Sequence, residues 1–222
     1  MTLLTGSSGQ LGVELQKLGV FYCPSQKDFD VVHPNSDWLL RMCPSVDSIL
    51  HCAADTRVTA IQTDPKVIWN AVEVNVLGTL QMALLANELD VPLYHISTET
   101  CLDPYNTYAK TKLLAEDMAS KARQHTILRT SFRSVPFEYD KAFTDQWTIG
   151  DSVEVIAGLI VDRLRRPTLQ MVEYIGTGAK TIYDLAKQTR PDVKPISIDE
   201  VNKKLTFAVK SMEQLRKVQC LP

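Results

Sequence analysis

Short apolar runs alternate with longer amphipathic stretches along most of this 222-residue chain. Apolar runs bounded by turn residues are typical of buried strands, and apolar positions that recur every three to four residues are typical of helices. The predicted strands are residues 2–5, 20–23, 48–52, 93–97, 126–130 and 169–175. The predicted helices are residues 10–18, 68–89, 105–123, 152–165, 181–188 and 209–217, and Pro167 ends the fourth of them.

This alternation predicts an α/β fold, a Rossmann-like doubly wound parallel sheet with helices on both faces. Right-handed crossovers then determine the topology. The pattern changes after residue 131, because residues 133–147 are rich in aromatic, proline and charged residues without a clear period. We therefore expect residues 1–131 to form the sheet domain, rejoined by about 150–175, and residues 132–222 to form a small part facing the carboxyl edge of the sheet.

The first predicted strand leads directly into a glycine-rich turn that opens a helix. Its spacing is Gly-x-x-Gly-x-x-Gly, from Gly6 to Gly12. Glycines at such a turn allow a tight bend and a close approach of the backbone to a pyrophosphate, and the helix N-terminus favours negative charge. The sequence therefore predicts a dinucleotide site, and the candidate contacts are Gly6, Ser8, Gly9, Gln10, Leu11 and Gly12.

A phenol and an ammonium lie four residues apart, at Tyr108 and Lys112, in a predicted helix. This spacing places both side chains on one face, where the ammonium lowers the pKa of the phenol and prepares it for proton transfer. An aromatic core residue beside a solvated lysine has the same spacing. Thr98, at the carboxyl end of a predicted strand, adds a hydroxyl, and the joint pattern favours catalysis.

Composition narrows the function classes. The 24 basic and 26 acidic residues leave no charge excess for nucleic acid or a membrane surface, and the longest apolar runs fall well short of a bilayer span. We therefore expect a cytoplasmic protein. The five scattered cysteines predict neither a disulfide framework nor a metal site. Cys101 is the one thiol that we expect near a substrate, because it lies between Thr98 and Tyr108.

Taken together, the motifs resemble the extended short-chain dehydrogenase/reductase family, and within it the nucleotide-sugar 4-reductases of the dTDP-4-dehydrorhamnose reductase type. The resemblance covers roughly the first three-fifths of the chain, in the order that the family has. The segments that carry it are residues 5–12, 51–54, 75–79, 95–98, 108–112 and 128–131.

The resemblance implies reduction of the 4-keto group of a nucleotide-linked 4-keto-6-deoxy sugar by NADPH, with NADH also open. It makes Tyr108 the general acid and Lys112 the partner of the tyrosinate and the ribose. Thr98 would hold the substrate carbonyl, and Asn75 would position its helix and a water relay to the lysine. The further cofactor contacts that it implies are Asp30, Val31, Ala53, Ala54, Thr130 and Ser131. Lys27, in a loop without an acid directly after the second strand, favours NADPH.

Several alternatives stay open at this stage. A related dehydratase would need an Asp-Glu pair after Thr98, whereas this chain has Glu99 and Thr100, so elimination chemistry is disfavoured. A 4-epimerase uses the same Tyr and Lys. The connection between Thr98 and Tyr108 and the C-terminal part are both shorter than in typical 4-reductases. A noncatalytic NADP-binding regulatory subunit, a homodimer and a site completed by a partner subunit therefore remain alternatives.

Overall fold

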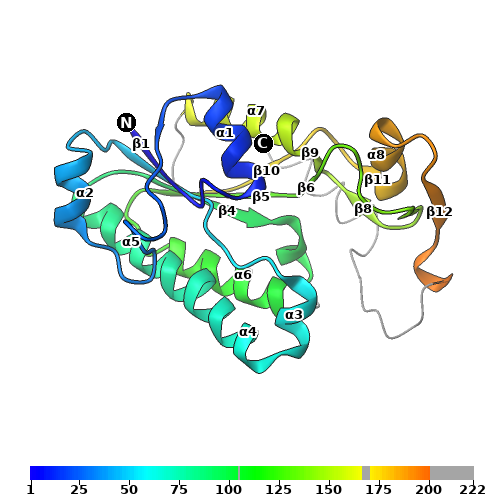
Figure 1. Cartoon of the computed structure of the whole chain (residues 1–222), viewed down its shortest axis with the longest axis horizontal. Helices are drawn as coiled ribbons and strands as arrows, with labels where there is room; N and C mark the ends of the chain where they lie inside the picture. The colour runs from blue at the N-terminus through cyan, green and yellow to red at the C-terminus, as the bar shows by residue number, and fades with distance from the viewer. Residues whose placement is uncertain (105, 167–170, 201–222) are drawn as a thin grey trace.

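The structure is a computed structural model that describes residues 1–104, 106–166 and 171–200. A six-stranded sheet lies at its centre, with all strands parallel in the order β10-β5-β4-β3-β1-β2 (Figure 1). The strands are β1 (Thr2–Thr5), β2 (Phe21–Tyr22), β3 (Ser48–His51), β4 (Leu93–Thr98), β5 (His125–Thr130) and β10 (Met171–Ile175). The predicted Rossmann-like fold class is therefore confirmed.

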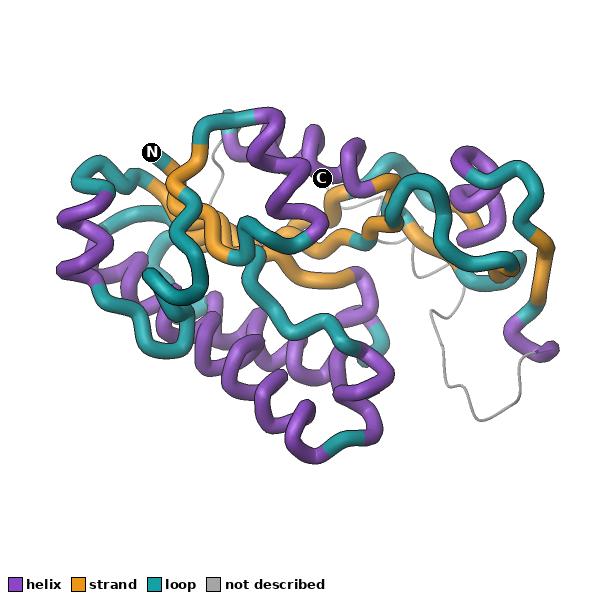
Figure 2. The backbone as a smooth tube through the Cα atoms, viewed as in Figure 1, coloured by secondary structure: helices purple, strands orange, loops and turns teal. Residues whose placement is uncertain are grey.

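Helices cover both faces of this sheet (Figure 2). The helices α1 (Gln10–Leu18) and α7 (Val153–Leu164) pack together on one face. The opposite face carries α2 (Ser36–Met42), α5 (Gly78–Leu89) and α6 (Thr107–Ala119). Beyond them lie α3 (Val58–Thr63), α4 (Pro65–Ala71) and the π-helical turn η1 (Val72–Leu77), which leads into α5. The sequence pattern did not predict α2 and α3, because each spans less than two turns of amphipathic sequence.

Adjacent residues of the central strands belong to opposite cores. Leu3 packs in the cluster beneath α5 and α6, whereas Leu4 packs in the cluster beneath α1 and α7. Ile127 and Leu128 divide in the same way. Side chains alternate between the two faces of a strand, so a sheet covered on both sides requires continuous apolar runs. This is why the central strands could be predicted from short apolar runs alone.

Side-chain caps explain why several helices begin one or two residues later than predicted. Asn106 accepts a hydrogen bond from the amide of Ala109, so α6 begins at Thr107 and not at residue 105. Ser152 accepts from the amide of Val155, so α7 begins at Val153. An N-cap residue has extended backbone and lies just outside the helix, so the helix begins at the next residue.

The C-terminal part differs from the predicted loop at residues 133–147. Within that stretch lie β7 (Lys141–Phe143) and the start of β8 (Trp147–Thr148), paired with β12 (Lys194–Ile196) and β11 (Lys180–Thr181). A further pair joins β6 (Phe132–Arg133) to β9 (Asp151–Ser152). Strands of two or three residues are too short to show a period, so this prediction was wrong. The helix α8 (Ile182–Thr189) follows β11. Two single 3-10 turns also occur, η2 (Glu99–Leu102) and η3 (Ile198–Glu200). The predicted helix 209–217 lies outside the described residues.

The continuous helix formed by α4, η1 and α5 bears on the expectation that the longest apolar runs fall well short of a bilayer span. It runs from Pro65 to Leu89, contains an 18-residue window with a mean hydropathy of 1.2, and is long and apolar enough to span a bilayer by length and composition. One face nevertheless carries polar residues that are buried on the sheet side, Asn75 and Thr79, and packs Met82 in the core. A core helix of a soluble protein can meet the same two criteria.

Candidate active site

The glycine turn lies where the strand order reverses, between β1 and β3. Gly6 has a φ of +70°, and a Cβ there would lie 2.6 Å from the backbone nitrogen of Ala53. A Cβ on Gly12 would lie 2.4 Å from the Gly6 carbonyl oxygen. Both positions therefore require glycine, because the turn, the loop after β3 and α1 touch one another through their backbones. Open α/β sheets bind nucleotides at this crevice, so the residues present fit a dinucleotide.

The first turn of α1 presents backbone and small polar side chains to solvent. Ser8, Gly9 and Gln10 are exposed, and no side chain caps the helix at Gly9. The amide of Gly9 donates to the carbonyl of Gly6 at 3.1 Å, so the amides available to a phosphate are those of the first turn after Gly9, where the helix dipole favours an anion. Leu11 belongs to the core beneath α7, so only its backbone faces the crevice side of the turn. Of the six predicted residues in this turn, two are therefore buried by packing, Leu11 and Gly12.

The remaining predicted cofactor contacts divide between the surface and the core. Ala53 and Ala54 are half-buried and follow β3 directly, beside the glycine turn. Asp30 is half-buried, and its carboxylate accepts a hydrogen bond from the amide of Val32. Val31 is buried in the core, and its side chain lies 3.0 Å from where a Cβ on Gly78 would be. Lys27 is exposed in the loop after β2.

The predicted catalytic residues come from two neighbouring elements. Thr98 is the last residue of β4, and its hydroxyl accepts from the amide of Thr100 at 3.3 Å. Tyr108 and Lys112 lie one turn apart on α6, which packs against β4. Thr98 and Tyr108 are both half-buried, whereas Lys112 is only 3% exposed. The fold therefore brings the strand end and the first turns of α6 to one side of the sheet.

Lys112 is turned into the protein. Its ammonium donates to the carbonyl of Ile96 at 2.7 Å and lies 3.3 Å from Nε2 of His95. Burial lowers the pKa of Lys112 to about 8, although Cys101 and Glu116 act in the opposite direction. A lysine that titrates near neutral pH can exchange a proton with its surroundings during turnover.

Asn75 ties three segments together, as its position in an apolar helix requires. The residue is fully buried in η1. Its side chain accepts from the amide of Asp55 at 2.7 Å and donates to the carbonyl of Asp55 and to the hydroxyl of Thr111, each at 3.1 Å. A π-helical turn is frequent at functional sites. Here it directs one amide at both the loop after β3 and the helix that carries Tyr108 and Lys112.

Glu99 has a structural partner that the sequence did not reveal. Its carboxylate accepts from the hydroxyl of Thr148 at 2.7 Å and from the amide of Ile149 at 3.1 Å. Burial raises the pKa of Glu99, although these two hydrogen bonds act in the opposite direction. The residue after Thr98 thus joins β4 to the C-terminal part, and its carboxylate is already occupied by two donors.

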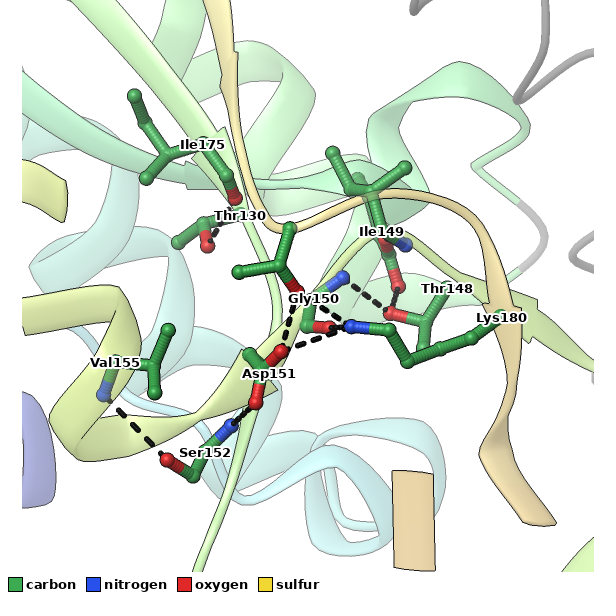
Figure 3. A network of polar contacts seen from close by, with 11 residues as sticks. Thr130, Thr148, Ile149, Gly150, Asp151, Ser152, Val155, Ile175 and Lys180 are labelled. Atoms are coloured by element: carbon green, nitrogen blue, oxygen red, sulfur yellow. Dashed lines mark hydrogen bonds and ion pairs between the residues drawn. The ribbon is translucent and has the colours of Figure 1, made fainter. Parts of the chain in front are cut away.

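Around Thr148 the C-terminal part returns to the sheet (Figure 3). The Thr148 hydroxyl accepts from the amide of Gly150 at 2.9 Å, and Lys180 contacts Asp151 at 2.8 Å. Thr130 donates to the carbonyl of Ile175 at 2.8 Å, which holds β5 to β10. The hydroxyl of Ser131 accepts from the Arg133 guanidinium at 3.0 Å. The side chain of Thr130 is therefore engaged within the sheet, and Ser131 is the more accessible of these two predicted contacts.

A buried ion pair positions α6 on the sheet, and the sequence reasoning missed it. Glu116 accepts from the Arg129 guanidinium at 2.6 and 2.8 Å and from the Ser97 hydroxyl at 2.5 Å. Burial works against the charge of Arg129, but the Glu116 carboxylate outweighs it, so the pKa of the guanidinium is raised. Arg129 also donates to the phenol of Tyr174 at 2.6 Å. A Glu four residues after the lysine was the available signal, but the arginine partner lies on another strand.

Cys101 lies on the buried side of η2 and not toward a substrate. The thiol is 5% exposed, 3.5 Å from the Ser97 hydroxyl and 3.9 Å from the Ala109 carbonyl. Burial raises its pKa to about 11, with a further contribution from Glu116. A thiol that is this buried and this weakly acidic is a packing residue.

Comparison with known proteins gives a family and a fold. Residues 1–172 match the family model described as RmlD substrate binding domain. A dTDP-4-dehydrorhamnose reductase of Sinorhizobium fredii is 28% identical over 191 residues, and the match covers 74% of this chain and 60% of that protein. A Methanocaldococcus jannaschii protein called uncharacterized membrane protein MJ1061 is 28% identical over 160 residues, 61% of this chain and 47% of that one. The chain thus spans about half to three-fifths of the length of these relatives.

Two solved structures have the same fold. A dTDP-4-dehydrorhamnose reductase from Bacillus anthracis, in complex with NADP, aligns with a TM-score of 0.72 and 21% identity over 89% of this chain and 84% of that one. An ortholog from Clostridium acetobutylicum aligns with a TM-score of 0.74 and 21% identity over 90% and 85%. At this identity the likeness concerns the fold.

Proposed function

The chain belongs to the family described as RmlD substrate binding domain, within the extended short-chain dehydrogenases/reductases, and from this membership we propose that it is an NAD(P)H-dependent reductase. Its substrate would be a nucleotide-linked 4-keto-6-deoxy sugar, as in rhamnose biosynthesis. The observation that carries the proposal is that α6, which bears Tyr108 and Lys112 one turn apart, packs against β4, which ends at Thr98, in a sheet whose first turn fits a dinucleotide. Residues 1–131 would hold the cofactor, and residues from 132 on would face the sugar.

Each residue has a distinct role in the proposed reaction. The bound dinucleotide supplies the hydride. The Thr98 hydroxyl would hold the substrate carbonyl, and the Tyr108 phenol would give its proton to the oxygen as charge builds there. Lys112 would stabilise the tyrosinate, and Asn75 would hold α6 in place through Thr111. Glu99 is engaged by Thr148 and Ile149, which supports reduction over elimination of water.

The cofactor would lie along the glycine turn, with its pyrophosphate at the N-terminus of α1. Ser8, Gly9 and Gln10 would face the phosphates, and Ala53 and Ala54 would let the cofactor pass over the backbone. Lys27 in the exposed loop after β2 supports NADPH over NADH, because an ammonium attracts the 2′-phosphate. We propose a cytoplasmic enzyme, with the helix from Pro65 to Leu89 serving as a cover of the sheet.

The test is oxidation of NADPH, followed by absorbance, with a panel of dTDP-, UDP- and GDP-linked 4-keto-6-deoxyhexoses. We expect turnover with at least one of them and a loss of about 100-fold or more in Tyr108→Phe. Tyr94→Phe removes the same hydroxyl from a tyrosine near the amino end of β4, at the opposite end of the strand from Thr98, and should leave the rate unchanged. Full activity of Tyr108→Phe would contradict the assigned proton donor.

One observation favours a second function, that of a noncatalytic NADP-binding subunit. Residues 99–107 alone connect Thr98 to Tyr108, and the turn η2 takes up the first of them. Little chain is then available to close over a substrate. Binding of NADPH without turnover of any sugar nucleotide, together with capture of a protein partner, would favour this alternative. Interconversion of 4-epimers without net oxidation of NADPH would identify an epimerase instead.

A further inference from the structure

Behind the proposed active site, the imidazole of His95 lies against the ammonium of Lys112. Nε2 of His95 is 3.3 Å from Nζ of Lys112, and the two residues come from β4 and α6. His95 is fully buried and Lys112 is 3% exposed. The lysine therefore meets two protein groups on its inner side, this imidazole and the carbonyl of Ile96.

In the part of the chain that the structure describes, the other ring nitrogen of His95 makes no contact that would require a polar side chain at this position. Nδ1 is buried and has no hydrogen-bond partner among the described residues. The neighbouring His51, whose ring centroid is 5.4 Å away, has both nitrogens paired, with Thr5 at 2.7 Å and Thr79 at 3.1 Å. An unpaired buried polar atom costs stability that an apolar side chain of similar size would not cost. The contact with Lys112 is the feature of His95 that an apolar residue would lose.

Burial and the charge of Lys112 keep this imidazole neutral, and several titratable groups face Lys112. They are Cys52 after β3, Cys101 in η2, Glu116 on α6, and His51 and His95 on the sheet. Burial, and then the charge of Lys112, lowers the pKa of His51 to about 3 and that of His95 well below its ordinary value. A neutral imidazole can accept a hydrogen bond at Nε2 from an ammonium and equally from an amine, which keeps two N–H groups.

We propose that His95 is a positioning residue that holds Lys112 in place in both of its protonation states. The inference deepens the proposed function, because it matters when Lys112 gives up a proton during reduction. In that step the phenol of Tyr108 protonates the substrate oxygen, the ammonium of Lys112 returns a proton to the tyrosinate, and water reprotonates the resulting amine. His95 keeps one tautomer throughout, because the amine of Lys112 still has N–H groups that donate to Nε2, and His95 is itself neither protonated nor consumed.

The test follows the titration of Lys112 itself, so it needs neither cofactor nor substrate. The protein is labelled with lysine carrying carbon-13 at Cε, the Lys112 resonance is assigned with Lys112→Met, and the pH is varied from about 6 to about 11. We expect a midpoint near the pKa of about 8 in the unchanged protein. In His95→Leu the ammonium loses an acceptor, so the midpoint should fall by about 1–2 pH units.

Three further variants separate this role from a general effect of losing a buried histidine. His95→Gln carries an amide that reaches the position of Nε2 and both accepts and donates, so its midpoint should stay within about 0.5 of the unchanged protein. His95→Asn is equally polar but too short to reach Lys112, and should behave like His95→Leu. His51→Leu removes the neighbouring buried histidine and should leave the midpoint unchanged. Equal midpoints in the unchanged protein, His95→Leu and His95→Asn would overturn the proposal.

The activity measurement then tells the two proposals apart. If the protein turns over no sugar nucleotide but the midpoints follow this order, the proposed function fails and the role of His95 in holding Lys112 stands. If turnover is found and His95→Asn keeps both the rate and its pH profile, the proposed function stands and the role of His95 fails.

Discussion

The sheet domain and the C-terminal part are stabilised by different means. Among the described residues, the two cores of the sheet domain contain fifteen and thirteen buried apolar residues, whereas the cluster around α8 contains five. Most central strands pair over four to six residues, but the strand pairs of the C-terminal part cover two or three. Packing determines the geometry of the sheet domain, and polar contacts must contribute more in the C-terminal part.

The charged groups follow the same division. The Glu116 to Arg129 pair lies inside the sheet domain, with side chains 7% and 14% exposed. It positions α6 on the sheet in a region that apolar packing already stabilises. Glu99 instead lies where the C-terminal part meets the sheet. The Lys180 to Asp151 pair lies in the same region, beside Thr148 and Gly150 (Figure 3). The C-terminal part is thus joined to the end of β4 by hydrogen bonds to Glu99 and not by a large apolar core. It is therefore the part that we expect to open first.

The largest expected effect comes from breaking the buried pair of the sheet domain. Arg129→Met leaves Glu116 buried without its counter-charge and should lower the free energy of unfolding by about 3–5 kcal/mol. The double variant Glu116→Leu/Arg129→Met removes both charges and should recover most of that loss. Urea unfolding measures both. A double variant as unstable as Arg129→Met would show that the pair is a net source of stability.

A smaller and more local effect is expected at the junction. Thr148→Val removes one donor from Glu99 and the acceptor of the Gly150 amide, which should cost about 1–3 kcal/mol. Amide hydrogen exchange should become faster in β8 and β11 but not in β1 or β4. Thr144→Val changes an exposed threonine nearby and serves as the control. Uniform acceleration across the sheet would contradict the division into two regions.

The smallest effect sharpens the same comparison. The Lys180 and Asp151 side chains are 16% and 13% exposed, between a surface pair and a buried one. Lys180→Met should therefore cost about 1–2 kcal/mol, whereas Lys121→Met, which breaks a pair that is 50% and 60% exposed, should cost less than about 0.5 kcal/mol. Thermal unfolding of the two variants measures the difference. Equal values would mean that the junction pair is screened like any surface pair.

The pattern of the sequence was enough for the sheet and for the principal candidate residues. Continuous apolar runs predicted the strands of the sheet, because both of its faces are covered, and the first strand and α1 have the predicted bounds. The glycine spacing and the Tyr108 to Lys112 spacing are local, so they could be recognised without the fold. The short strands of the C-terminal part could not be predicted, since two residues show no period.

The sequence by itself determined the fold class, the glycine turn and the face shared by Tyr108 and Lys112, because each depends on neighbours a few residues apart. Only the tertiary structure decided which polar groups of different elements contact one another. Glu99 accepts a hydrogen bond from Thr148, 49 residues away in the sequence, and Lys112 contacts His95, 17 residues away on another element. The direction in which a buried charge shifts a pKa depends on such partners and on burial, and both exist only after the chain has folded.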